Sequence, residues 1–164
     1  MQHAPAPCPV GGERALTPGE VALAGSVFGD AINCAQVTIR RRKFFPFQPR
    51  KVTMAPRGHI HFHPLGSVYC DDFASASLAR RALFIHEMTH VWQTQTRGEW
   101  YLVINRHPWC SYDYTIKPGW RLDLYGIEQQ AMIVQHAFML REGAKVPGAP
   151  PLEVYRAILP FAMA

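Results

Sequence analysis

The residues of this chain best suited to chemistry lie in segment 84–93, which reads FIHEMTHVWQ and contains the pattern His-Glu-x-x-His. Residues four positions apart lie one turn apart on the same face of an α-helix, so His86 and His90 can present imidazole nitrogens to one metal ion. Glu87 projects about 100° around the helix axis, where it can act as a base on water without binding the metal. Chance would produce this pattern about 0.02 times in a chain of this composition, so it indicates a zinc site. The alternative is that both histidines only form hydrogen bonds in a core.

A catalytic zinc ion usually has three protein ligands and one position open to water. The elongated motif that adds a Gly and a third His is not present, because Gln93 and Thr96 occupy those positions. The third ligand is therefore expected further along the chain. Glu128 is our first candidate, because it is an acid near the start of an otherwise apolar second helix. The alternative for Glu128 is stabilisation of the helix dipole, and the reserve candidates for the third ligand are His136, His107 and Asp123.

This ligand set predicts a hydrolytic mechanism. Two neutral imidazoles and a carboxylate around Zn²⁺ would bring the pKa of a bound water towards neutrality. Glu87 would take a proton as the water attacks a carbonyl, and would return it to the leaving amine. The developing oxyanion needs a second electrophile, and the spacing alone does not choose among the suitable groups, which are Tyr112, Tyr114, Tyr125 and the remaining histidines.

A second group of histidines alternates along one short segment. His59, His61 and His63 are separated by Ile60 and Phe62, which is the period of two that is typical of a β-strand. Three histidines on one strand face could bind a metal, but we favour a polar, exposed face of an edge strand, because nothing nearby would fix their orientation.

Several elements can be predicted from start and stop signals. The segment TPGE at 17–20 is a capping box with proline at the first helical position, so a helix should begin there. A long helix is expected from Ser77 to about Thr96, ended by Gly98, and a second from about Leu122 to Arg141, closed by Gly143. Short strands are expected at 37–41, 52–54 and 59–63, a further strand at 100–104, and a short helix at 152–158.

Composition places the chain among single globular domains. It has 164 residues, a formal charge of +5 and 48% hydrophobic residues, without a heptad or Gly-X-Y period, which excludes collagen, coiled coil and full-length disorder. We expect a flexible proline-rich arm at 1–13 and one domain at 14–164. Every apolar run is too short to span a membrane. No secretory signal is visible, which predicts a cytoplasmic protein unless another export route is used.

Two other features argue against particular function classes. The cysteines contain no Cys-x-x-Cys pair, so we expect free thiols rather than a zinc ribbon or a thioredoxin-type site. A basic cluster at 40–43 is followed by Arg50 and Lys51, but no nucleic-acid-binding motif accompanies it. We therefore expect neither a nucleic-acid partner nor a membrane partner.

The chain resembles the zincin-like metallopeptidase family found with Rhs and Vgr proteins of bacterial polymorphic-toxin and type VI secretion systems. The resemblance lies in LTPGE at 16–20, VFG at 27–29, GHIHF at 58–62 and FIHEMTHVWQ at 84–93, and it covers about residues 14–142. Tyr125 and Glu128, with Ala131, resemble the ligand segment of the family's second helix, and Tyr125 is the catalytic tyrosine that we predict. The chain departs from the family in lacking a large second domain.

The resemblance implies an α+β, zincin-like fold in which a small mixed or antiparallel sheet packs on the motif helix and on a second ligand-bearing helix. It also implies Zn²⁺ at His86, His90 and Glu128, with Glu87 as the base. A bacterial protein linked to a Vgr or Rhs spike or toxin apparatus, and exported by a type VI-like route, is the implied context.

Three functions remain open at this point. The first is a zinc-dependent peptidase that acts on a peptide or protein substrate. The second is a non-catalytic accessory module of a secretion spike, in which zinc holds two helices together through a closed fourth ligand. The third is an amidase-type toxin domain that attacks a cell-wall amide.

Overall fold

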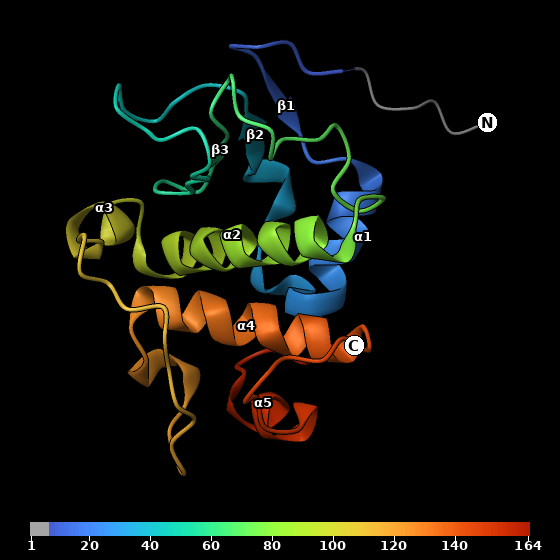
Figure 1. Cartoon of the computed structure of the whole chain (residues 1–164), viewed down its shortest axis with the longest axis vertical. Helices are drawn as coiled ribbons and strands as arrows, with labels where there is room; N and C mark the ends of the chain where they lie inside the picture. The colour runs from blue at the N-terminus through green and yellow to red at the C-terminus, as the bar shows by residue number, and fades with distance from the viewer. Residues whose placement is uncertain (1–6) are drawn as a thin grey trace.

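The structure is a computed structural model that describes residues 7–164. It has the expected α+β character, with a small sheet and several helices (Figure 1). The strands are β1 (Glu13–Ala15), β2 (Thr38–Arg40) and β3 (Ile60–His61). The α-helices are α1 (Pro18–Phe28), α2 (Leu78–Arg97), α3 (Tyr101–Asn105), α4 (Ile127–Arg141) and α5 (Leu152–Ile158). Short 3-10 turns are η1 (Gly29–Ala31), η2 (Cys34–Gln36) and η3 (Leu122–Leu124).

The sheet is mixed and has the order β1-β2-β3. Strand β1 runs antiparallel to β2, whereas β3 runs parallel to β2 with Ile39 opposite Ile60. Both isoleucine side chains are completely buried. The sheet therefore uses its β-branched residues to cover one side of the core.

The elements are stacked so that α2 lies in the middle of the molecule. Figure 1 shows the sheet on one side of α2, with α4 on the other side and α5 beyond α4. Helix α4 is covered by both α2 and α5, and its buried residues occupy several faces, including Ile127, Glu128, Ala131, Ile133, Val134, Ala137 and Phe138. The charged or polar residues of α2 and α4 that face each other are thus shielded from water.

Local signals explain where α1 begins and where α2 begins and ends, and these predictions are confirmed. Thr17 and Glu20 form the capping box of α1, with the Thr17 hydroxyl accepting from the Glu20 amide and the Glu20 carboxylate accepting from the Thr17 amide. Ser77 precedes α2, which ends at Gly98 in a conformation with φ of 97°. The short helix α5 also lies where the sequence predicts it.

Other expectations were wrong. Most of segment 100–104 belongs to helix α3 instead of a strand, although its aromatic and β-branched residues favour a strand. The second long helix begins at Ile127, because Gly126 is extended and its amide is capped by Gln129. Of segment 52–54, only Met54 makes a β-bridge, to His61.

Contrary to our prediction, segment 59–63 does not present its three histidines on one exposed face. The side chain of His61 is buried, and its Nδ1 lies 3.3 Å from the Arg42 carbonyl oxygen. His59 contacts the Thr38 hydroxyl at 2.9 Å, and His63 Nδ1 accepts from the amide of Leu65. Each imidazole has a separate partner, so they do not form one site.

The described end of the expected arm lies against the domain. Cys8 is buried and its amide donates to Asp71, while Gly11 donates to the carbonyl of Arg41. Residues 1–6 of the arm lie outside the described residues. All four cysteines are free thiols, as expected. Within residues 7–164, the helices fall short of the length and apolar character that crossing a bilayer requires.

Candidate metal centre

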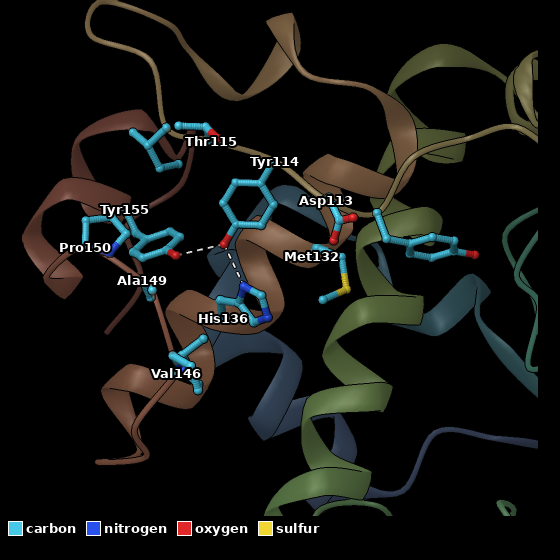
Figure 2. Close-up of a pocket in the computed structure, with 13 residues that line it drawn as sticks. Asp113, Tyr114, Thr115, Met132, His136, Val146, Ala149, Pro150 and Tyr155 are labelled. Carbon is cyan, nitrogen blue, oxygen red and sulfur yellow. Dashed lines mark hydrogen bonds between the residues drawn. The ribbon is translucent and has the colours of Figure 1, made fainter.

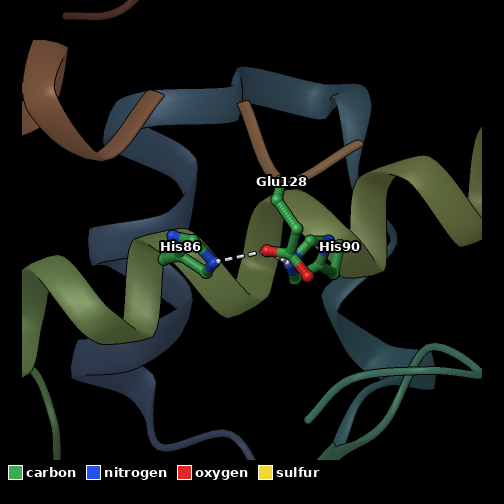
Figure 3. A group of neighbouring side chains, drawn as sticks. All are labelled: His86, His90 and Glu128. Atoms are coloured by element: carbon green, nitrogen blue, oxygen red, sulfur yellow. Dashed lines mark hydrogen bonds and ion pairs between the residues drawn. The ribbon is translucent and has the colours of Figure 1, made fainter. Parts of the chain in front are cut away.

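Helices α2 and α4 bring the three predicted ligands together. His86 and His90 are one turn apart on α2, and Glu128 comes from the first turn of α4. Glu128 Oε2 lies 3.3 Å from His86 Nε2 and 3.1 Å from His90 Nε2 (Figure 3). All three side chains are buried, with exposed fractions of 7%, 2% and 1%.

These separations suit a tetrahedral zinc ion. Zinc binds His nitrogen and carboxylate oxygen at about 2.0–2.2 Å, which places neighbouring ligand atoms about 3.4 Å apart. Among the described residues, no fourth His, Cys, Asp or Glu joins the group of three. Three protein ligands would leave one coordination position for water or substrate.

Glutamine side chains fix the orientation of both imidazoles. Gln135 Oε1 lies 3.0 Å from His86 Nδ1, and Gln93 Oε1 lies 2.8 Å from His90 Nδ1. The amide of Gln93 can only point this way, because its Nε2 donates to the Ile127 carbonyl and to Gln130. An amide oxygen accepts a hydrogen bond, so the Nδ1 atoms carry the protons and the Nε2 lone pairs face Glu128.

A positive charge between the three candidate ligand atoms would stabilise their arrangement. Two imidazole lone pairs and a carboxylate oxygen converge there, and acceptors this close repel one another unless a proton or a cation lies between them. Burial lowers the pKa of His90, but the hydrogen bond and negative charge of Glu128 outweigh it, so the pKa is raised. Burial likewise opposes ionisation of Glu128, yet its contacts with the His86 and His90 imidazoles and the positive charge of Arg106 hold its pKa well below the usual value. The residues present therefore fit a divalent cation.

Glu87 lies next to His86 on α2 and is buried, with an exposed fraction of 4%. Its Oε2 atom is buried and has no hydrogen-bond partner among residues 7–164. A buried carboxylate oxygen without a partner is rare in folded proteins, and it often marks a catalytic group. Glu87 is thus available to exchange a proton with a molecule in the site.

Two residues from the loop after α3 complete the surroundings. Arg106 Nε lies 2.9 Å from Glu128 Oε1 as an ion pair, although its N–H direction does not satisfy hydrogen-bond geometry. The ring of Tyr112 stacks near His86, with 6.4 Å between ring centroids. Burial and the negative charge of Glu128 raise the pKa of Tyr112, which keeps its hydroxyl protonated. The sequence singled out Tyr112 as one of several tyrosines, and no spacing pattern pointed to Arg106.

The other sequence candidates have different surroundings. The hydroxyl of Tyr125 accepts from the amide of Lys117, and its ring packs on Trp120. His136 Nδ1 shares a hydrogen bond with the Tyr114 hydroxyl. The ring of His107 lies near that of Trp109, and Asp123 forms an ion pair with Arg121. Of the groups considered for the oxyanion, Tyr112 is the one with a described contact to a candidate ligand.

Comparisons with known proteins point to one bacterial system. No family model matches the chain. It is 42% identical over 134 residues to the type VI secretion system spike protein VgrG2b of Pseudomonas aeruginosa. That match covers 77% of the chain but only 13% of the spike protein.

A solved structure gives the fold-level match. The chain aligns with the effector domain of P. aeruginosa VgrG2b at a TM-score of 0.70 and 34% identity. The alignment covers 89% of this chain and 83% of that domain. The chain therefore belongs to the family of the VgrG2b effector domain.

Proposed function

We propose that this chain is a zinc-dependent hydrolase, a metallopeptidase with a zincin-like active site. His86, His90 and Glu128 would hold the zinc ion, and Glu87 would act as the general base. The observation that carries this proposal is the convergence of three buried acceptor atoms next to a buried carboxylate with a free oxygen. This is the ligand number of a catalytic zinc site rather than of a closed structural one.

Zinc bound at this position would polarise a substrate carbonyl and lower the pKa of water towards 7. Glu87 would accept the proton of the attacking water and donate it to the leaving amine. For the oxyanion we now favour Tyr112 over Tyr125, since Tyr112 stacks near His86 whereas the Tyr125 hydroxyl is already bonded to the amide of Lys117. Arg106 would balance the second carboxylate oxygen of Glu128 and hold that side chain in place.

The biological setting that we propose follows from the relatives. One is a type VI spike protein and the other is its effector domain. We propose that this chain associates with a Vgr- or Rhs-type spike protein, leaves the cell by that route, and acts on a peptide or protein substrate. An amidase-type toxin domain is the second candidate, because the same base and metal could cleave a cell-wall amide and the related domain is named an effector.

The test compares wild-type protein with Glu87→Gln, and Glu99→Gln serves as a control because Glu99 is exposed and pairs with Arg57, away from the candidate ligands. Each protein is loaded with zinc, its metal content is measured, and it is incubated with a peptide library and with purified peptidoglycan. We expect one zinc per chain in all three proteins. Cleavage should fall by about 10²–10⁴-fold in Glu87→Gln and stay unchanged in Glu99→Gln.

The substrate pool that is cleaved decides between the two candidates. Cleavage of peptides supports the peptidase, and cleavage of peptidoglycan alone supports the amidase. Full activity of Glu87→Gln would contradict both. Zinc binding without turnover on either pool would favour the accessory module.

A further inference from the structure

A pocket of about 540 Å³ opens along α4 (Figure 2). Its walls come from the extended segment 112–116, from α4, from the loop at 146–150 and from Tyr155 of α5. The volume lies in the range of about 300–1,000 Å³ that ligand pockets occupy. The pocket is therefore large enough for a bulky side chain of a bound peptide.

The pocket adjoins the candidate metal centre, although His86, His90 and Glu128 are not among its lining residues. Tyr112 lines it and also stacks near His86. Met132 follows Glu128 by one turn of α4, and His136 follows by another turn, so the pocket wall extends along α4 from the third ligand. A peptide with its reacting bond at the centre would place a neighbouring side chain here.

The polar groups of the pocket satisfy one another. The hydroxyl of Tyr114 lies 2.6 Å from His136 Nδ1 and 2.7 Å from the Tyr155 hydroxyl, as Figure 2 shows. Burial lowers the pKa of His136, so the imidazole is neutral near pH 7. Tyr155 is completely buried. These three groups need no charged ligand, and only His136 Nε2 has no partner among the described residues.

The pocket surface is about equally polar and apolar, and its apolar part comes mainly from Ile116, Met132, Val146, Pro147, Ala149 and Pro150. Asp113 is the one lining residue with a formal charge at pH 7, and its side chain is exposed. A carboxylate or ammonium group inside would lose its hydration without gaining a buried partner of opposite charge. An apolar or aromatic side chain would gain by leaving water.

We propose that this pocket receives a large apolar or aromatic side chain of the substrate, next to the bond that is cleaved, and so determines which peptides the enzyme accepts. This inference rests on the proposed function, because the pocket can select a substrate only if the chain is a hydrolase. The pocket's preference for a ligand can nevertheless be measured without turnover.

The first arm of the experiment measures binding in the full-length Glu87→Gln protein. The probes are N-acetyl-phenylalanine amide, N-acetyl-alanine amide and N-acetyl-aspartate amide at millimolar concentration. The readout is the ¹³C-methyl NMR signal of Met132, identified by its loss in Met132→Leu. We expect the phenylalanine probe to shift this signal at least about tenfold more than the other two at equal concentration.

The second arm fills the pocket. Val146→Trp and Thr115→Trp add an indole from two different walls, and Val21→Trp makes the same change on the exposed side of α1. We expect both pocket variants to abolish the Met132 shift. In a zinc-loaded protein with Glu87 intact, they should lower kcat/KM at least about tenfold for peptides with Phe or Leu beside the cleaved bond. They should change cleavage of matched Ala peptides by less than about twofold, and Val21→Trp should behave as wild type in both arms.

The two arms separate the two proposals. A selective Met132 shift that the pocket variants remove, in a protein that cleaves nothing, supports the pocket and contradicts the proposed hydrolase. Cleavage that prefers acidic or basic side chains, or that both pocket variants leave unchanged, would overturn the pocket assignment and leave the hydrolase intact. Equal shifts with the phenylalanine and aspartate probes would also overturn it.

Discussion

At the scale of single residues, the candidate centre depends on contacts behind the imidazoles as much as on the imidazoles. Gln135 and Gln93 accept hydrogen bonds from the Nδ1 atoms, which leaves both Nε2 lone pairs directed at Glu128. Without those amides each ring could rotate or exchange its tautomer. The folded protein has thus already compensated for the entropy that is lost when the imidazole rings become ordered, before any metal binds.

Gln135→Ala tests this directly, because the Gln135 side chain is only half-buried and has His86 as its described partner. Removing a hydrogen-bond partner of a ligating histidine typically lowers metal affinity by about 10–100-fold. We expect a loss in that range in a competition titration for zinc with a chromophoric chelator. Gln95→Ala is the matched control, because Gln95 lies on α2 but bonds to Asn33. Equal zinc affinity in all three proteins would contradict the role of Gln135.

His61 predicts a pH dependence of stability. Burial, with the positive charge of Arg40, lowers the pKa of His61 to about 4, against the opposing hydrogen bond to the Arg42 carbonyl. The unfolded chain takes up this proton near pH 6.5, but the folded chain does so only near pH 4. The stabilisation is therefore complete above pH 6.5, is lost as pH falls to about 4, and amounts to at most about 3 kcal/mol.

Urea unfolding at several pH values between 7 and 4 measures this loss. We expect His61→Gln to flatten the decline, whereas His107→Gln, which changes an exposed histidine elsewhere in the chain, should keep it. Parallel curves for His61→Gln and wild type would show that another group causes the decline.

The candidate ligands could be predicted from the sequence, and much of their environment could not. His86, Glu87 and His90 share one helix, so their relation follows from helical spacing alone. Glu128 was found as an acid in an apolar helix. Arg106 and Tyr112 reach the centre from a loop whose path depends on tertiary packing, and no periodicity encodes that path.

At the scale of elements, local caps made the helices predictable. The start of α1 and the end of α2 could be predicted because Thr17, Glu20 and Gly98 act through contacts within a few residues. Segment 100–104 was assigned wrongly because its strand propensity is overridden. Tyr101 and Ile104 donate backbone hydrogen bonds to Gly98 and Trp100, and Arg57 stacks on the Trp100 ring. Strand propensity is a weak guide where local backbone hydrogen bonds and a tertiary contact of this kind act together.

The α1 cap is tied to more than its own helix. Glu20 is completely buried and accepts two hydrogen bonds from Arg14, at 2.8 and 2.9 Å, and one from the amide of Phe73. This carboxylate joins β1, α1 and the loop before α2. It therefore helps to hold the motif helix against the rest of the domain.

We expect Glu20→Gln to lower the free energy of unfolding by about 3–5 kcal/mol, because it leaves the Arg14 charge without its buried partner. Glu153→Gln is the control, since Glu153 is exposed and pairs with Arg156 within one turn of α5. That change should alter stability by less than about 0.5 kcal/mol. Denaturant unfolding of the three proteins is the measurement, and similar midpoints for both variants would refute the structural role of Glu20.

At the scale of the whole molecule, the candidate centre lies where α2 and α4 meet. Helix α2 contributes two of the three candidate ligands, and α4 contributes the third while α5 covers its other side (Figure 1). The α+β class was implied by the family resemblance. The mixed three-stranded sheet was too short to fix strand boundaries, because two- and three-residue strands carry almost no periodicity.

Zinc X-ray absorption on the chain loaded with one equivalent of the ion would show whether His86, His90 and Glu128 hold the metal. The account predicts four-coordinate zinc with two imidazole nitrogens at about 2.0–2.1 Å, and with oxygen from Glu128 and from water or buffer at about 2.0–2.2 Å. Glu128→Ala should change that signal, and His59→Ala should not. A chain that takes up no stoichiometric zinc, or a spectrum with sulfur at about 2.3 Å, would contradict the account.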